Sequence, residues 1–243
     1  MIDLTNAEAQ SLSASLRGLE RGRDAEAKPL TEVDHSVSDA YWTDSRTITV
    51  DVLQPFTQTY QSGGIHTPPE FRLWLTTLAL GMHAREIIET GYDAGYTTLA
   101  LALSGAHVVG IDNLTEYPDA DQVARHNLAG CRNVQLIQCD ALGYLRGRAD
   151  ESVDLIFIDD NHNPFHVHQE ALEARRILRP GGYAVFHDTL SRELWYVVES
   201  VFPDWQRVQL PCFSPAAGQD YGAGLVRKPA RNERDNGRGT HGN

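Results

Sequence analysis

After residue 85 the chain alternates between short apolar runs and segments whose apolar residues recur at helical spacing. Such runs are typical of buried strands, and their alternation with helices is typical of parallel βαβ units covered on both faces. The sequence therefore predicts an α/β fold. Strands are expected at 86–90, 107–111, 134–138, 153–158 and 183–187, and helices at 97–104, 118–129 and 164–178.

Two further strands are expected at 205–210 and 221–227. The short connection between them indicates a hairpin, which would add an antiparallel strand at the edge of the sheet. The whole is then a mostly parallel, seven-stranded sheet with an antiparallel edge strand.

The chain divides into three parts. Residues 1–84 are predicted to form a helical N-terminal segment that caps the ligand-bearing edge of the sheet, and residues 85–228 form the α/β domain. Residues 229–243 are rich in Gly, Asn and Arg and are expected to be disordered. A helix that begins at Pro68-Pro69 carries one apolar face, assigned to the core or to a dimer interface: Phe71, Trp74, Leu75 and Leu78.

Composition limits the classes of function. A net charge of −12 over 243 residues argues against general binding to nucleic acid or to an anionic membrane. The most apolar segment, 73–82, has about half of the ~20 residues that a membrane span needs, and the N-terminus lacks the pattern of a secretory signal. Three scattered cysteines form no CxxC pair. We expect a cytoplasmic protein without a zinc or disulfide framework.

A glycine turn follows the first strand, in Glu89-Thr90-Gly91-Tyr92-Asp93-Ala94-Gly95. Gly91 permits a tight turn close to a ligand, and Gly95 lets the next helix pack near the strand. The spacing differs from the Gly-x-Gly-x-x-Gly of dinucleotide binders, and Asp93 would place a negative charge against a pyrophosphate. A purely structural turn is the alternative.

Acidic residues end the next two strands. Asp112, followed by Asn113, comes twenty-one residues after Gly91, where a carboxylate can accept both hydroxyls of a ribose. Asp140, followed by Ala141, ends the third strand and could accept from an amino group such as that of adenine. Each acid alone could instead cap a helix. Their order and spacing together favour a nucleoside cofactor.

With these motifs the chain resembles the class I S-adenosylmethionine-dependent methyltransferases, a Rossmann-like fold. The glycine turn looks like the first motif of O-methyltransferases that act on catechols and caffeoyl thioesters. The runs Phe157-Ile158-Asp159-Asp160-Asn161-His162 and Leu178-Arg179-Pro180-Gly181-Gly182 resemble bacterial members found in natural-product pathways. The resemblance implies that the cofactor-binding residues are Glu89, Gly91, Asp93, Gly95, Asp112, Asn113, Asp140, Ala141 and Asp159.

Methyl transfer to oxygen needs alignment with the methyl group and help in removing the acceptor's proton. In catechol-type relatives, carboxylates at the positions of Asp159 and Asp188 bind Mg²⁺. Thr189 stands here where those relatives carry Asn, so a metal at Asp159 and Asp188 is one hypothesis. The other is that Asp159 faces the cofactor and Asp188 caps the next helix.

Histidines gather in the same region of the sequence. His162 is the first candidate base and His187 the second, because imidazole titrates near neutral pH. His162 and His166 are spaced i, i+4, but Asn163-Pro164 predicts that the helix begins after His162. We expect His166 and His168 to lie on the surface beside a loop. Farther upstream, His66, Tyr41 and Trp42 either line the acceptor pocket or pack in the N-terminal segment.

The resulting prediction is methyl transfer from S-adenosylmethionine to a small metabolite or natural-product intermediate, with oxygen as the acceptor atom. The prediction allows Mg²⁺ as a second cofactor and a second copy of the chain as a partner. One alternative is a fold that binds the cofactor but acts as a cyclase or as a non-catalytic partner. The other is an NAD-dependent oxidoreductase, which the glycine spacing and Asp93 disfavour.

Overall fold

The computed structural model describes residues 67–190, 194–214 and 219–231. Nearly all of the predicted N-terminal segment and most of the predicted tail lie outside these ranges, as do Tyr41, Trp42 and His66. None of the described helices combines the length and the apolar character that a membrane-spanning helix requires.

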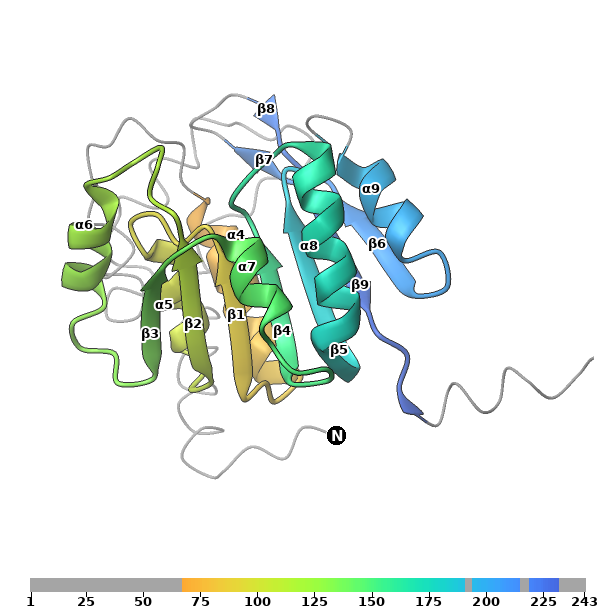
Figure 1. The fold of residues 1–243 in the computed structure, drawn as a ribbon, viewed down its shortest axis with the longest axis horizontal. Coiled ribbons are helices and arrows are strands. Elements are labelled where there is room, and N and C mark those ends of the chain that lie inside the picture. The colour runs from red at the N-terminus through yellow and green to blue at the C-terminus, as the bar shows by residue number, and fades with distance from the viewer. Residues whose placement is uncertain (1–66, 191–193, 215–218, 232–243) are drawn as a thin grey trace, which may run out of the picture. The chain divides into compact units, whose positions relative to one another are not determined.

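Seven strands form one sheet in the order β3-β2-β1-β4-β5-β9-β6 (Figure 1). The first five strands in the chain are parallel, and β9 runs antiparallel between β5 and the edge strand β6. This confirms the predicted α/β fold. The strands are β1 (Glu86–Thr90), β2 (His107–Asp112), β3 (Val134–Gln138), β4 (Val153–Ile158), β5 (Leu178–His187), β6 (Gln206–Leu210) and β9 (Ala223–Arg227), with a separate pair β7 (Phe213–Ser214) and β8 (Gln219–Asp220).

Helices pack on both faces of this sheet (Figure 1). Residues of α7, α8 and α9 join one hydrophobic cluster, and residues of α4 and α5 join the other. The helices expected at 97–104, 118–129 and 164–178 are present, and α7 is a further helix of six residues. The helices are α4 (Pro69–Gly81), α5 (Tyr96–Ala102), α6 (Ala120–Asn127), α7 (Ala141–Arg146), α8 (Pro164–Ile177) and α9 (Leu194–Val201).

Strand β1 shows why the central strands carry apolar residues on both faces. Its side chains alternate between the two faces, so that Ile87 belongs to the cluster of α4 and α5 and Ile88 to the cluster of α7, α8 and α9. Helix α4 contributes Phe71 and Leu75 to the core. Of the two locations predicted for these residues, the core and a dimer interface, the structure shows the core.

The order of the strands reverses between β1 and β4, where β2 follows on one side of β1 and β4 lies on the other. At such a reversal the connections leave to opposite faces, which opens a crevice beyond the carboxyl ends of the strands. Thr90, the last residue of β1, pairs with Ile111 of β2 and with Ile158 of β4. The residues that follow these three strands therefore meet at one edge.

At the opposite end of the sheet, Asp154 of β4 anchors the start of β1. Its Oδ2 accepts hydrogen bonds from the backbone N–H groups of Arg85 and Glu86, at 2.8 and 2.9 Å. Its Oδ1 accepts from Arg179 Nη1 of β5 at 2.7 Å. One carboxylate thus fixes the relative position of three neighbouring strands.

We predict that Asp154→Ala lowers the free energy of unfolding by about 2–4 kcal/mol, because three donors lose a charged acceptor. The matched control is Asp150→Ala, which removes an exposed partner of Arg176 and should cost less than about 1 kcal/mol. Urea unfolding measures both variants. Equal losses in the two would contradict the anchoring role of Asp154.

Candidate functional site

Gly91 makes the turn that follows β1. Its φ is +81°, a conformation that favours glycine, and its N–H donates to Ile111 O at 2.7 Å. A Cβ at this position would lie 2.5 Å from Asp159 O and 2.7 Å from Asp160 Cα. The backbone therefore crosses directly over the end of β4, which only glycine allows.

Gly95 plays the predicted packing role at the start of α5. Its φ is +78°, and a Cβ there would lie 2.9 Å from Leu128 Cδ1 and 3.1 Å from Ala124 Cβ. Asp93 lies between the two glycines, also at a positive φ of 42°. The turn is thus compact for reasons of packing, and it presents backbone and Asp93 at the carboxyl edge of the sheet.

Asp112 ends β2 beside this turn. Its Oδ2 accepts from the N–H of Asp93 at 3.0 Å, and its Oδ1 accepts from the N–H of Leu114 at 2.7 Å. Burial raises the pKa of Asp112, while these two hydrogen bonds favour its ionised form. Each oxygen has a second lone pair, so the carboxylate is oriented and can still accept two hydroxyls. The exposed Asn113 instead accepts from Thr115 N–H and Oγ1.

Glu89 is a buried acid near the carboxyl end of β1. Its Oε2 accepts from the Thr98 hydroxyl, and its Oε1 has no hydrogen-bond partner among the described residues. Desolvation raises the pKa of Glu89 to about 8. A cationic group at this edge would therefore stabilise its ionised form.

Asp140 is the N-cap of α7, where its Oδ2 accepts from the N–H of Gly143 at 2.6 Å. This is the capping role that the sequence left open as an alternative. Ala141, the first residue of the helix, is buried. The cap places both residues after β3, beside the end of β2.

Four side chains at the ends of β4 and β5 form ion pairs with one another. His162 Nε2 lies 2.7 Å from Asp188 Oδ2 and 3.7 Å from Asp159 Oδ1. His187 Nδ1 lies 2.9 Å from Asp159 Oδ1 and 3.4 Å from Asp188 Oδ1. The structure therefore brings together all four residues that were predicted for catalysis or metal binding. We call these four residues the β4–β5 cluster.

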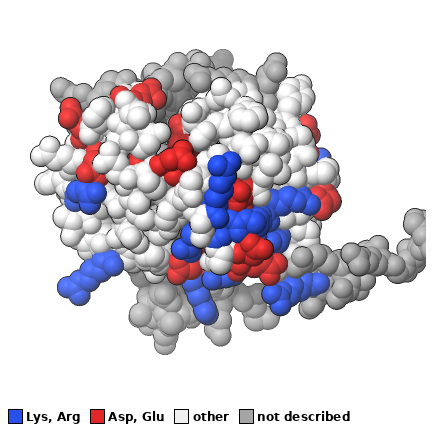
Figure 2. All heavy atoms as spheres, viewed as in Figure 1, with Lys and Arg blue, Asp and Glu red and all other residues white. Residues whose placement is uncertain are grey.

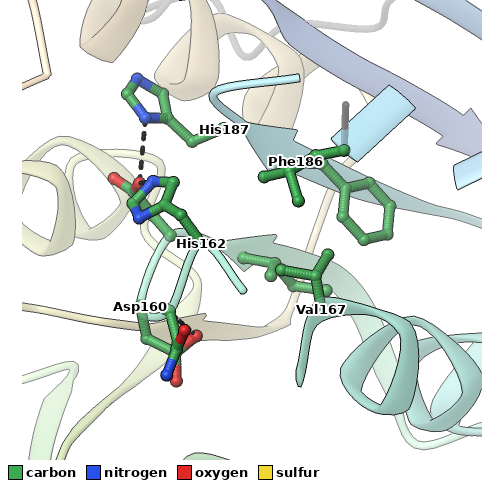
Figure 3. Close-up of a pocket in the computed structure, with 9 residues that line it drawn as sticks. Asp160, His162, Val167, Phe186 and His187 are labelled. Atoms are coloured by element: carbon green, nitrogen blue, oxygen red, sulfur yellow. Dashed lines mark hydrogen bonds and ion pairs between the residues drawn. The ribbon is translucent and has the colours of Figure 1, made fainter. Parts of the chain in front are cut away.

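The cluster borders a small pocket, and Figure 3 shows His162 and His187 on the same side of it. His162 comes from the loop after β4, and the N-cap Asn163 confirms that α8 begins after it. The pocket is lined by Ile158, Asp159, Asp160, Asn161, His162, Val167, Phe186, His187 and Leu194.

The two histidines differ in exposure. The side chain of His162 is 26% exposed, whereas that of His187 is 11% exposed and packs 4.6 Å from the Tyr221 ring and 5.6 Å from the Phe71 ring. His162 is thus the one that a ligand in the pocket can reach more easily.

The carboxylates control the charge of both imidazoles. Interaction with Asp159, followed by Asp188, raises the pKa of His162 to about 9. Burial alone would lower the pKa of His187, but the same two carboxylates outweigh it and raise the pKa to about 10. The histidines in turn hold the pKa of Asp188 well below its usual range, against the effect of its burial. The raised pKa values favour the protonated form of both imidazoles beside these carboxylates.

His166 is not a surface histidine beside a loop, as the sequence suggested. It lies in the first turn of α8, where its Nε2 is 3.3 Å from Asp160 Oδ2 and 3.8 Å from Glu170 Oε2. Glu170 is completely buried. The sequence analysis missed Asp160 and Glu170, although the spacing of His166 and Glu170, i and i+4, places both on one face of a helix.

Two groups of side chains could hold a metal ion, because their ligand atoms lie within 4.8 Å of one another in each group. One is Asp159, His162 and His187 in the β4–β5 cluster. The other is Asp160, His166 and Glu170. Each mixes imidazole nitrogen with carboxylate oxygen, a donor set suited to first-row transition ions.

The charge at the two ends of the sheet differs. In Figure 2 basic side chains mix with acidic ones toward the end where the strands begin, while the coloured side chains near the top of the view are mostly acidic. Figure 1, in the same orientation, places the carboxyl ends of the parallel strands toward the top. This edge is suited to a ligand that carries positive charge.

Residues 88–189 match a family described as a methyltransferase domain. A search of curated proteins found no match. Among solved structures, the chain is similar to an O-methyltransferase from Bacillus cereus in complex with SAH, at 19% identity and a TM-score of 0.55, over 82% of this chain and 94% of that one. It is also similar to the O-methyltransferase TomG from Streptomyces achromogenes in complex with SAM, at 18% identity and a TM-score of 0.57, over 83% and 93%.

At these identities the two structures establish the fold, and the domain match covers the turn, the strand-end acids and the β4–β5 cluster. Residues 88–189 therefore match a methyltransferase domain, and the chain has the fold of the O-methyltransferases that it resembles.

Proposed function

We propose that the protein transfers a methyl group from S-adenosylmethionine to an oxygen atom of a small metabolite or natural-product intermediate. The observation that carries the proposal is the β4–β5 cluster, which sets an imidazole in a pocket at the carboxyl edge, beside the glycine turn. The similarity to O-methyltransferases, one of which is described as involved in tomaymycin synthesis, supports an oxygen acceptor. The cytoplasmic location and the dimer stay predictions.

In this proposal Asp112 accepts the ribose hydroxyls, because its two oxygens are already oriented by backbone N–H groups. The turn at Gly91 lies against the methionine end, and Glu89 beneath it compensates positive charge there. When bound, the cofactor supplies an activated methyl group on a sulfonium. The acidic edge favours this cationic form over the neutral product, which helps the product to leave.

His162 is the proposed base that takes the acceptor's proton. The carboxylates of Asp159 and Asp188 hold its ring in place and stabilise the cation that forms when the proton arrives. His187 is the less exposed imidazole, and we assign it a positioning role on Asp159. Because the pKa of His162 is about 9, only a minor fraction of the free protein carries the neutral ring at pH 7.

The residues do not fit the Mg²⁺ site of catechol-type relatives. Mg²⁺ requires near-octahedral oxygen ligands, but here Asp159 and Asp188 each face imidazole nitrogens. Thr189, which stands where those relatives carry Asn, is buried, and its hydroxyl accepts from Gln209 Nε2 at 3.5 Å. The proposal therefore routes no step through Mg²⁺.

The first prediction concerns the cofactor. S-adenosylhomocysteine should raise the melting temperature, by the equivalent of about 2.7 kcal/mol at 100 times its Kd, because it binds only the folded protein. NAD at the same concentration should have no effect, since Asp93 opposes a pyrophosphate. Differential scanning fluorimetry measures both. Stabilisation by NAD alone would favour the oxidoreductase alternative, while cofactor binding without any methylated product across a panel of hydroxyl compounds would favour the cyclase or partner alternative.

The second prediction concerns Asp112. Asp112→Ala should weaken binding of S-adenosylhomocysteine by about tenfold or more in calorimetry, because both ribose acceptors are lost. Asp119→Ala is the matched control: Asp119 is exposed, makes no capping hydrogen bond, and should leave the affinity within about twofold. An unchanged affinity in Asp112→Ala would refute the assignment.

The third prediction concerns pH. The turnover number should rise about tenfold per pH unit below pH 9 and then level off, because His162 becomes neutral only near its pKa of about 9. His162→Asn should lower turnover by roughly 10²–10⁴-fold, abolish this rise and leave cofactor affinity unchanged. The control His168→Asn changes a histidine of α8 that does not line the pocket, and it should keep the wild-type profile. If His162→Asn kept the rise, another group would be the base.

A further inference from the structure

A second cluster lies next to the β4–β5 cluster and takes no part in the proposed methyl transfer. It consists of Asp160, two residues after β4, and of His166 and Glu170 on one face of α8. Figure 3 shows Asp160 away from His162 and His187. We call these three residues the α8 cluster.

Glu170 is the unusual member. Its side chain is 0% exposed, and neither carboxylate oxygen accepts an aligned hydrogen bond from a described residue, although Asp160 and the Thr90 hydroxyl lie close to it. A buried acid in this state costs free energy unless a proton or a cation accompanies it. Burial, with a further contribution from Asp160, raises the pKa of Glu170 well above its ordinary value.

The three side chains converge without forming aligned hydrogen bonds. His166 Nε2 lies 3.3 Å from Asp160 Oδ2 and 3.8 Å from Glu170 Oε2, yet it too makes no hydrogen bond to a described residue. The backbone N–H of Asn161 donates to Asp160 Oδ1, which leaves Oδ2 directed at His166. Ligand atoms about 3–4 Å apart can all lie about 2.0–2.2 Å from one ion.

The charges of the two clusters separate their roles. The β4–β5 cluster contains two carboxylates and two imidazoles and can neutralise itself by protonation of both rings. The α8 cluster contains two carboxylates and only one imidazole, so with His166 protonated it is neutral only while Glu170 keeps its proton, and Asp140 adds a negative charge nearby. A bound cation would take the place of that proton.

We propose that Asp160, His166 and Glu170 bind one first-row divalent cation such as Zn²⁺. One imidazole and two carboxylates suit Zn²⁺ or Mn²⁺ better than Mg²⁺, which prefers oxygen ligands alone. Three protein ligands leave a position for water, and the partial exposure of Asp160 and His166 gives the ion a path of entry.

The ion would tie the first turns of α8 to the end of β4. The Cα of Asp160 would lie only 2.7 Å from a Cβ at Gly91, so Asp160 packs directly against the glycine turn. An ion bound by Asp160 would hold the backbone under this turn in place. The role is one of positioning, and the binding site does not depend on the proposed methyl transfer. Because Glu170 exchanges its proton for the ion, binding should release protons at neutral pH.

The test uses the full chain after dialysis against a chelator. Zn²⁺, Mn²⁺ and Mg²⁺ are titrated separately by calorimetry, in two buffers of different ionisation enthalpy, and bound metal is counted after desalting. We expect one equivalent of Zn²⁺ with release of protons, and much weaker binding of Mg²⁺. Glu170→Gln and His166→Asn should each weaken Zn²⁺ binding by about 100-fold or more, while His168→Asn, on the same helix, should bind as the wild type does.

Two controls keep the result clear. Glu170→Gln has nearly the same shape as protonated Glu170, so its melting temperature in EDTA should match that of the wild type, and only the wild type should gain stability from Zn²⁺. If Glu170→Gln does not fold, His166→Asn carries the test. The proposal is overturned if both variants keep the wild-type affinity for Zn²⁺, or if only His162→Asn loses it, which would place the ion in the β4–β5 cluster.

Discussion

The crossing of the backbone at Gly91 is the contact on which the site depends. There the chain leaves β1, and the N–H of Gly91 donates a hydrogen bond to the carbonyl of Ile111 in β2. The backbone also passes so close to Asp159 and Asp160 that a single Cβ would not fit. This crossing brings Asp112, His162 and the α8 cluster to the same edge of the sheet. A substitution at Gly91 would thus disturb the proposed cofactor, base and cation sites together.

A second constraint is the density of acids at this edge. Glu89 and Glu170 are both fully buried, on opposite faces of the sheet, and burial raises the pKa of each carboxyl group. Such groups destabilise the fold when they ionise alone, but the same ionisation becomes favourable when a cation is bound. The edge therefore couples its own stability to cationic ligands, one of which is the sulfonium cofactor of the proposed function.

The strands and the acids at their ends could be predicted because both follow from the pattern of neighbouring residues in the sequence. Apolar runs buried on both faces identified the parallel strands, and residues directly after strands had to meet at one edge, which placed Asp112 and Asp159. Helix α7 was missed because its six residues are too few for a periodic pattern, so the capping role of Asp140 stayed only an alternative to a role in ligand binding. His166 was assigned to the surface because its partners, Asp160 and Glu170, are recognised only once the loop after β4 is folded back onto α8.

The adjacent positions of Asp159 and Asp160 explain how one loop can serve two kinds of chemistry. Consecutive residues that leave a strand point to opposite sides, so Asp159 faces His162 and His187 while Asp160 faces His166. The first group, matched in charge, can store and release a proton without a large electrostatic cost. The second group lacks a second imidazole, so its buried Glu170 can ionise only when a cation takes the place of its proton. The difference of a single imidazole therefore separates the proposed site for proton transfer from the proposed site for a metal ion.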